Sequence, residues 1–266
     1  SISDSIGSSG NTILGGLYSK IQTTVGSANF IGGGIGSIIS GGTAFSTVMG
    51  GYLNIIGTTS GSANFIGGGL QNKISGTSFY GTILGSSQGY LFNSSKSIIA
   101  GGSTHSILDS DNSAIIGGFN NDIITGSRYS ILSSGYDNLL VQSEYCGIFA
   151  GFNTVMSGES HSVIIGGRNH SIKSPLATTS VYNIIAGGYG HIIGSPFGIA
   201  YCGIFGGDSN SMLGGFGSAI LGGQGNKVDG SVASATFAGS TLEISNLSFS
   251  NLCSLILFFL KYTISL

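Results

Sequence analysis

The apolar positions of this chain repeat with a period of about 17 residues. The string GSANFIGGG occurs at 26–34 and again at 61–69, an offset of 35 residues. Half of that offset recurs along the chain as a pair of small residues, from Gly15-Gly16 to Ala238-Gly239. The pairs mark fourteen units, most of them 16–18 residues long. Self-similarity at a fixed period indicates a repeat architecture.

Each unit contains two short apolar segments separated by turn residues. Two apolar residues precede the small pair, as in Ile115-Ile116, and another follows it five residues later, as in Ile123. No 3.6-residue period is present, and the unit is too short for a helix and a strand. The sequence therefore predicts an all-β chain, a parallel β-solenoid (β-roll or β-helix) of about 14 rungs of 16–18 residues. Stacking of the units would supply the core.

Adjacent strand residues point to opposite faces, so the first of the two apolar residues is predicted to stack inside the solenoid. The residues predicted for this stacked core are Ile13, Ile83, Ile115, Ile131, Ile148, Ile164, Ile204 and Ile220. The second residue is predicted to form an outer row, in which Ile116, Leu132, Phe149 and Ile165 lie in one line. Monomeric proteins rarely expose such a stripe. We therefore expect a homo-trimer, with end-to-end assembly as a further possibility.

Composition supports short strands and excludes several functions. Glycine accounts for 49 of the 266 residues, hydrophobic residues for 41% and charged residues for 7%. The net charge of −2 provides no basic footprint for nucleic acid. Three cysteines are too few for a disulfide scaffold. Cys146 and Cys202 share a position that small residues fill elsewhere, so we expect small-residue packing and no bond between them.

The predicted organisation has three parts: an N-terminal lead-in at 1–10, the β-solenoid at 11–244, and an apolar C-terminal segment at 245–266. The last part contains LILFFL at 255–260, which is far shorter than a membrane-spanning segment. We expect it to act as a hydrophobic cap or oligomer plug. Contact with another subunit or with a membrane is the alternative.

A polar row lies three residues after the small pair. Its members are Asn54, His105, Asn121, Asp137, His170, His191, Asn210 and Asn226. Asn, Asp and His are enriched at positive φ and bond to nearby backbone in turns, which predicts a structural turn role. His170 and His191 fall on neighbouring rungs, which leaves open a shared metal or anion site.

The acidic residues form no shared row, whereas enzymes that cut polysaccharides need converging carboxylates. Asp109 and Asp111 are the one close pair, and we expect a solvated turn there. A calcium β-roll would require an acid where Lys227 stands. We predict no catalytic residues, no cofactor and no enzymatic activity.

Units such as 113–126, with the sequence SAIIGGFNNDIITG, resemble the head repeats of trimeric autotransporter adhesins. They also resemble Gly-rich solenoid repeats of phage and large-virus fibre proteins, and the likeness covers about 11–244. The resemblance implies three chains about a common axis, an extracellular, virion or cell-surface location, and binding of a host protein or glycan. The unit here is longer than the usual adhesin head repeat, which favours a fibre, spike or filament subunit.

The leading hypothesis is a structural or adhesive fibre whose surface turns, including the inserts at 173–183 and 195–201, contact a partner. An ice-binding solenoid is one alternative, because Thr12, Thr47 and Thr82 share a row that alternates with Asn29 and Asn64. A polysaccharide-depolymerase spike is the other.

Overall fold

A computed structural model describes the chain over residues 2–4, 10–24, 28–174, 181–195, 199–232, 235–236 and 239–245. Within these ranges the chain is all-β, with parallel strands stacked as a β-solenoid of about 13 turns. This confirms the predicted fold class. Both prolines, Cys253 and residues 246–266 lie outside the described residues. No helix long and apolar enough to cross a bilayer occurs in the described part of the chain.

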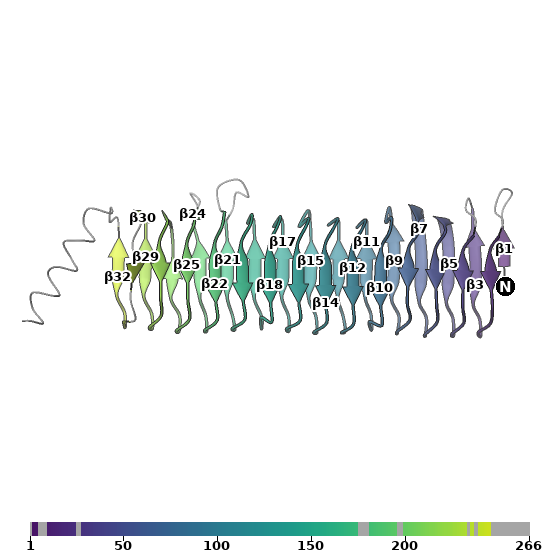
Figure 1. Ribbon diagram of the computed structural model, residues 1–266, viewed down its shortest axis with the longest axis horizontal. Helices are drawn as coiled ribbons and strands as arrows, with labels where there is room; N and C mark the ends of the chain where they lie inside the picture. Colours follow the sequence, from purple (N-terminus) through teal and green to yellow (C-terminus); the bar gives the residue numbers. More distant parts are fainter. Residues whose placement is uncertain are drawn as a thin grey trace, which may run out of the picture. The chain divides into compact units, whose positions relative to one another are not determined.

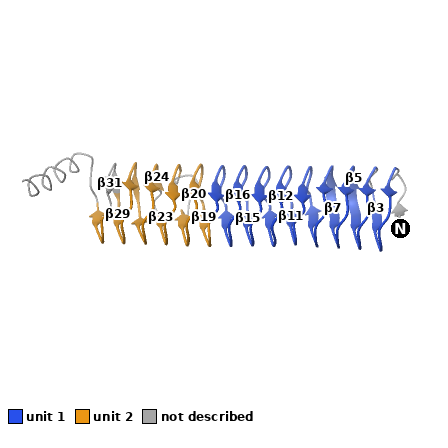
Figure 2. Ribbon diagram, turned by 60° about the horizontal axis from the view of Figure 1, so that its bottom comes forward, with its two compact units in different colours: residues 1–150 blue, residues 151–266 orange. Residues whose placement is uncertain are grey.

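The chain divides into two compact units, residues 1–150 and 151–266 (Figure 2). The boundary falls inside the segment 11–244 predicted as one repeat domain. In each unit, every turn contributes one strand to sheet A and one to sheet B (Figure 1). Neighbouring strands in a sheet therefore differ by two or three in strand number.

Unit 1 contains nine described strands in each sheet. Sheet A is formed, in spatial order, by β1 (Ile2–Asp4), β3 (Lys20–Thr23), β5 (Ile38–Ala44), β7 (Ile55–Ser62), β9 (Lys73–Gly76), β11 (Tyr90–Phe92), β13 (Ser106–Leu108), β15 (Asp122–Ile124) and β17 (Leu139–Val141). Sheet B is formed by β2 (Thr12–Ile13), β4 (Phe30–Ile31), β6 (Thr47–Val48), β8 (Phe65–Ile66), β10 (Thr82–Leu84), β12 (Ile98–Ala100), β14 (Ala114–Ile116), β16 (Ile131–Ser133) and β18 (Gly147–Phe149).

Unit 2 has the same two sheets and, in addition, a short third sheet. Sheet A is formed by β19 (Val155–Ser157), β21 (Ser171–Lys173), β23 (Ile192–Gly194), β26 (Ser211–Met212), β29 (Lys227–Asp229) and β32 (Glu243–Ser245). Sheet B is formed by β20 (Val163–Ile165), β22 (Ile184–Ala186), β25 (Gly203–Ile204), β28 (Ala219–Ile220) and β31 (Ala235–Thr236). The third sheet is formed by β24 (Ile199–Ala200), β27 (Gly215–Phe216) and β30 (Ser231–Val232).

The core of each turn consists of one apolar side chain from each sheet. Ile115 of sheet B pairs in register with Ile99, and Ile123 of sheet A pairs with Ile107; all four are fully buried. β-Branched side chains suit this packing because they fit a pleated surface well. A constant spacing of eight residues separates the two core residues of a turn, as from Ile115 to Ile123 and from Ile164 to Ile172.

Two residues of the predicted stacked core differ from the expectation. Ile131 pairs with Ala114 and points outward, half-buried, whereas the next residue, Leu132, pairs with Ile115 and is fully buried. The prediction for Ile131 was therefore wrong by one position. Ile13 is inward-facing but only half-buried. The other six predicted core residues are fully buried.

The glycine pairs have two different roles. Gly34 has φ of 93°, and a Cβ there would collide with the backbone carbonyl of Gly51 in the next turn. Gly33, its neighbour, would meet nothing within 4 Å. The second glycine is therefore needed both for its left-handed conformation and for close approach of the turns, whereas the first faces open space.

Candidate functional site: the outer face of sheet B

Two outward-facing positions flank the buried residue of each sheet B strand, and together they form the outer face of sheet B. In unit 1 the row before the buried residue consists of Thr12, Phe30, Thr47, Phe65, Thr82, Ile98, Ala114, Ile131 and Gly147. The row after it consists of Leu14, Gly32, Met49, Gly67, Leu84, Ala100, Ile116, Ser133 and Phe149. In unit 2 they are Val163, Ile184, Gly203, Ala219 and Ile165, Ala186, Phe205, Leu221.

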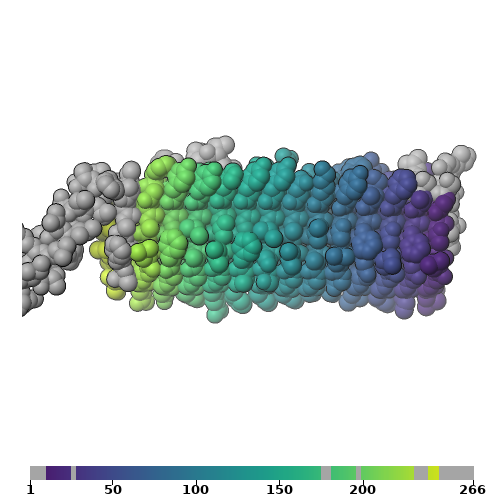
Figure 3. Space-filling view, in the orientation of Figure 1, coloured from purple at the N-terminus to yellow at the C-terminus, as the bar shows by residue number. Residues whose placement is uncertain are grey.

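This face is apolar and exposed. Leu84 is 44% exposed, Ile116 46%, Ile165 48% and Phe205 43%. None of the described residues in these rows is charged. One position of the predicted outer line was wrong: Ser133, and not Leu132, stands between Ile116 and Phe149. In each unit the side chains of successive turns lie in rows (Figure 3).

Phenylalanine rings cover glycines on this face. A Cβ on Gly147 would lie 2.7 Å from Cε2 of Phe149, and a Cβ on Gly203 would lie 2.7 Å from Cε2 of Phe205. The same arrangement joins Gly32 to Phe30 and Gly67 to Phe65, where the distances from the Cβ position to Cε1 are 3.2 and 3.1 Å. The rings thus lie over the backbone of these glycines.

Unit 2 has a shallow open groove of about 350 Å³ on the same face. Gly203 and Ala219 are small residues of its lining, and Phe205, Tyr182 and Tyr201 are its large side chains. The two tyrosine rings are stacked, with centroids 5.1 Å apart. The groove is a place where an apolar side chain of another molecule could be inserted.

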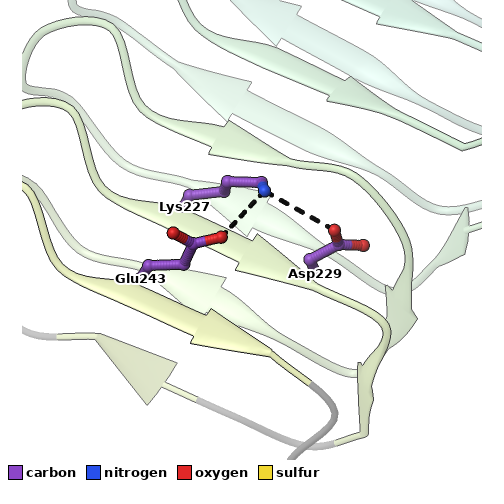
Figure 4. Close-up of polar contacts among 3 residues, drawn as sticks. All are labelled: Lys227, Asp229 and Glu243. Atoms are coloured by element: carbon purple, nitrogen blue, oxygen red, sulfur yellow. Dashed lines mark hydrogen bonds and ion pairs between the residues drawn. The ribbon is translucent and has the colours of Figure 1, made fainter.

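The outer face of sheet A differs from that of sheet B in charge. Beside apolar residues such as Ile38, Leu108 and Ile192, its outward residues include Lys20, Lys73, Asp122, Lys173, Lys227, Asp229 and Glu243. Lys227 Nζ lies 2.9 Å from Glu243 Oε1 and 3.6 Å from Asp229 Oδ2 (Figure 4). The hydrogen bond and charge of Glu243, assisted by Asp229, raise the pKa of the Lys227 ammonium. Charged side chains are therefore placed on sheet A and kept off sheet B.

The predicted polar turn row lies inside the solenoid, where its side chains bond to backbone. Asn54 Oδ1 accepts the N–H of Asn72 at 3.0 Å, while Asn54 Nδ2 donates to the carbonyls of Gly50 and Gly69. Asn121, Asn210 and Asn226 form the same ladder of hydrogen bonds in their turns. These bonds satisfy backbone groups that the tight turns leave without a strand partner.

Two details of that prediction were wrong. Positive φ occurs one residue before the buried side chain, for example at Leu53 (53°) and Thr104 (59°). Asp137 itself has φ of 58° and is exposed, and the buried residue of its turn is Asn138. The sequence reasoning missed Asn72 and Asn138, although each lies two residues before a core residue of sheet A, where the other members of the row also lie.

Histidines occupy this row at His105, His170 and His191. The rings of His170 and His191 stack with centroids 5.0 Å apart, so the structure does bring the two candidate ligands together. Each Nδ1, however, already accepts a backbone N–H from the next turn. Within the described ranges no group of three or more His, Cys, Asp or Glu side chains is placed to hold a metal ion. The arrangement is that of a structural ladder.

The structure also shows where the Thr and Asn residues that suggested an ice-binding surface lie. Thr12, Thr47 and Thr82 alternate with Phe30 and Phe65 on the outer face, while Asn29 and Asn64 are buried. The predicted Thr and Asn row was therefore wrong, and phenyl rings interrupt the hydroxyl array that an ice-binding surface needs.

The close acidic pair contributes to turns. Asp109 Oδ1 accepts a hydrogen bond from Asn93 Nδ2, and Asp111 Oδ1 accepts one from the Ser95 backbone N–H. Cys146 and Cys202 are buried and form no disulfide bond with a described residue, and their backbone N–H groups donate to Ser130 Oγ and Asn183 Oδ1 of the preceding turns. Burial raises the pKa of the Cys202 thiol, which disfavours the reactive thiolate form.

Comparison with protein-family models and with curated proteins finds no match for this chain. The inference about function therefore depends on the geometry of the two outer faces.

Proposed function

We propose that this chain is a structural subunit of a fibre, spike or filament that associates with further copies of itself through the outer face of sheet B. The observation that carries the proposal is the contrast between the two faces. Large apolar side chains such as Leu84, Ile116 and Phe205 are exposed on sheet B with no charged residue in the described rows, whereas sheet A mixes charged side chains with apolar ones such as Ile192. A continuous exposed apolar patch on a soluble protein marks an interaction surface.

A second copy of the chain is the partner that this face fits best. Both copies would present uncharged rows with the same spacing of about 4.8 Å between strands. The nine strands of sheet B in unit 1 would by themselves offer roughly 400 Å² for each chain at that spacing. That area is about half of the approximately 800 Å² for each partner of a standard stable interface.

Aromatic rows border the face on both sides, which supports a trimer. Tyr52 and Phe119 lie at the turns that lead from sheet B to sheet A, and Tyr80 and Tyr145 lie at the turns that lead into sheet B; all four are about half exposed. In a three-fold assembly each border would meet a different neighbour. The polar turns and the outer face of sheet A would then remain free to contact a host protein or glycan at an extracellular, virion or cell surface.

Sedimentation velocity of the purified full chain tests the proposal. We expect a trimer at micromolar concentration, and dissociation to monomers when Leu84→Glu and Ile116→Glu are combined on sheet B. The matched control combines Leu108→Glu and Ile124→Glu, which change the same residue types on the outer face of sheet A. A monomeric wild-type chain, or equal effects of the two pairs in chains that retain their β-structure by circular dichroism, would overturn it.

A further inference from the structure

The interior of unit 2 contains two histidines on adjacent turns, in the buried row that holds Asn54, Asn72, Asn121 and Asn138 in unit 1. His170 precedes β21 and His191 precedes β23, and each side chain is buried. Their rings are 5.0 Å apart between centroids and 8° from parallel. His105 of unit 1 occupies the same row with Asn121 in the next turn, so it has no ring stacked on it from that side.

The hydrogen bonds of this pair require both rings to be neutral. The N–H of His191 donates to His170 Nδ1 at 3.1 Å, and the N–H of Asn210 donates to His191 Nδ1 at 3.2 Å. Each Nδ1 must therefore present a lone pair, and the ring proton belongs on Nε2. In a protonated imidazole both nitrogens carry hydrogen, so the Nδ1–H would face the N–H of the next turn.

The surroundings offer little compensation to a charged ring. Both Nε2 atoms are buried and have no hydrogen-bond partner among the described residues. The backbone of Gly188 partly offsets the effect of burial on the pKa of His170, and that of Gly206 does so for His191. Burial and the neighbouring His191 lower the pKa of His170 to about 4. Burial also lowers the pKa of His191, and Asp208 partly offsets it.

The other charged groups of these turns point elsewhere. The Arg168 guanidinium lies over the ring of Phe152, with 4.7 Å between its Cζ and the ring centroid. Lys173 lies on the outer face of sheet A. Glu159 is buried, and its carboxylate accepts hydrogen bonds from Ser162 Oγ and Asn183 Nδ2. Asp208 is therefore the carboxylate that acts on the pair, and it acts on His191.

We propose that the stacked pair His170 and His191 is an acid-sensitive switch, which opens the turns of unit 2 around it while turns built on asparagine stay closed. Protonation turns two hydrogen-bond acceptors into donors that oppose backbone N–H groups, and it places two like charges one turn apart. This inference goes beyond the proposed function and does not depend on self-association.

The pH range follows from the direction of the shifts. Because the folded-state pKa lies below the ordinary value of 6.5, the unfolded state binds more protons in the interval between them. The stabilisation by neutral rings is complete above about pH 6.5 and is lost progressively as the pH falls toward about 4.

Hydrogen–deuterium exchange of the full chain, followed by mass spectrometry from pH 7 to pH 4, tests the switch. The reference is the double variant His170→Asn and His191→Asn, because asparagine fills the same row at Asn210 and Asn226. We expect exchange in 152–174 and 181–195 of the wild type, relative to the variant at the same pH, to increase on the order of a hundredfold between pH 7 and pH 4. The control His105→Asn should give a smaller change, confined to unit 1, because Asp122 raises the pKa that burial lowers there. A wild-type to variant ratio that does not change with pH overturns the proposal.

A second measurement applies should the double variant fail to fold. In the wild type, the imidazole carbon resonances of His170 and His191 are followed by NMR as the pH is lowered. We expect titration well below pH 6.5, with simultaneous loss of the amide signals of the surrounding turns. Titration of both rings near pH 6.5 with intact amide signals would refute the switch.

Discussion

The two units build the same rows from different side chains. In unit 1 the buried polar row holds Asn54, Asn72, Asn121 and Asn138 together with Ser19, Ser37 and His105, and the corner row after sheet B, which runs through Ile35, Tyr52 and Phe119, has no charged residue. In unit 2 the buried row contains the stacked histidines beside Asn210 and Asn226, and the corner row adds Arg168 and Asp208 to Phe152 and Tyr189. The backbone conformation of sheets A and B is therefore the same in both units because small, polar and apolar residues stand at the same positions of each turn. The charge and hydrogen bonding of a turn differ with the residue that fills each position.

The largest expected effect tests whether the two units share one kind of core. We expect Ile115→Ala in unit 1 and Ile185→Ala in unit 2 each to lower the free energy of unfolding by about 2–4 kcal/mol, because both side chains are fully buried. Ile131→Ala is the control and should cost less than about 1 kcal/mol, since Ile131 faces outward. Urea titration followed by circular dichroism gives these values. Equal effects of Ile131→Ala and Ile115→Ala would contradict the register.

A somewhat smaller effect tests the glycine pairs in both units. We expect Gly34→Ala and Gly223→Ala each to destabilise the chain by about 1–3 kcal/mol, because both have positive φ and face the backbone of the next turn. Gly33→Ala and Gly222→Ala are the matched controls, because a Cβ at either position meets nothing within 4 Å. Thermal unfolding of the four variants should separate them into these two pairs. Loss of stability in Gly33→Ala or Gly222→Ala would show that the first glycine of the pair also cannot accept a side chain.

The smallest expected effect comes from building a histidine pair, as found in unit 2, into unit 1. Asn121→His would place a second ring directly after His105 in the ladder. We expect this variant to lose about 1–2 kcal/mol of stability between pH 7 and pH 4 relative to the wild type, because a buried pair of histidines must remain neutral. Urea titrations of both chains at the two pH values measure the difference. The same pH dependence of stability in variant and wild type would show that two histidines on adjacent turns of the buried row are not enough to make the chain acid-sensitive.

Most of the fold could be predicted because one period governs the chain. The errors in register share one cause: where two apolar residues stand together, as in Ile131-Leu132, alternation alone does not say which one faces inward. The three small residues Ser133-Ser134-Gly135 follow these two residues, so the small pair can be assigned to 133–134 or to 134–135. The first choice shifts the predicted core position one residue too early. The constant spacing of eight between core residues, as from Leu132 to Leu140, would have given the correct register.

The sequence by itself determined the repeat, the parallel stacking and the separation of an apolar core from an apolar outer row. These follow from period and alternation, which are local properties of the chain. Only the tertiary structure decided that the Asn and His row points inward, that phenyl rings cover glycines, and that His170 and His191 stack. Such contacts join residues of different turns, and their geometry depends on a register of one residue that the turns set when they stack.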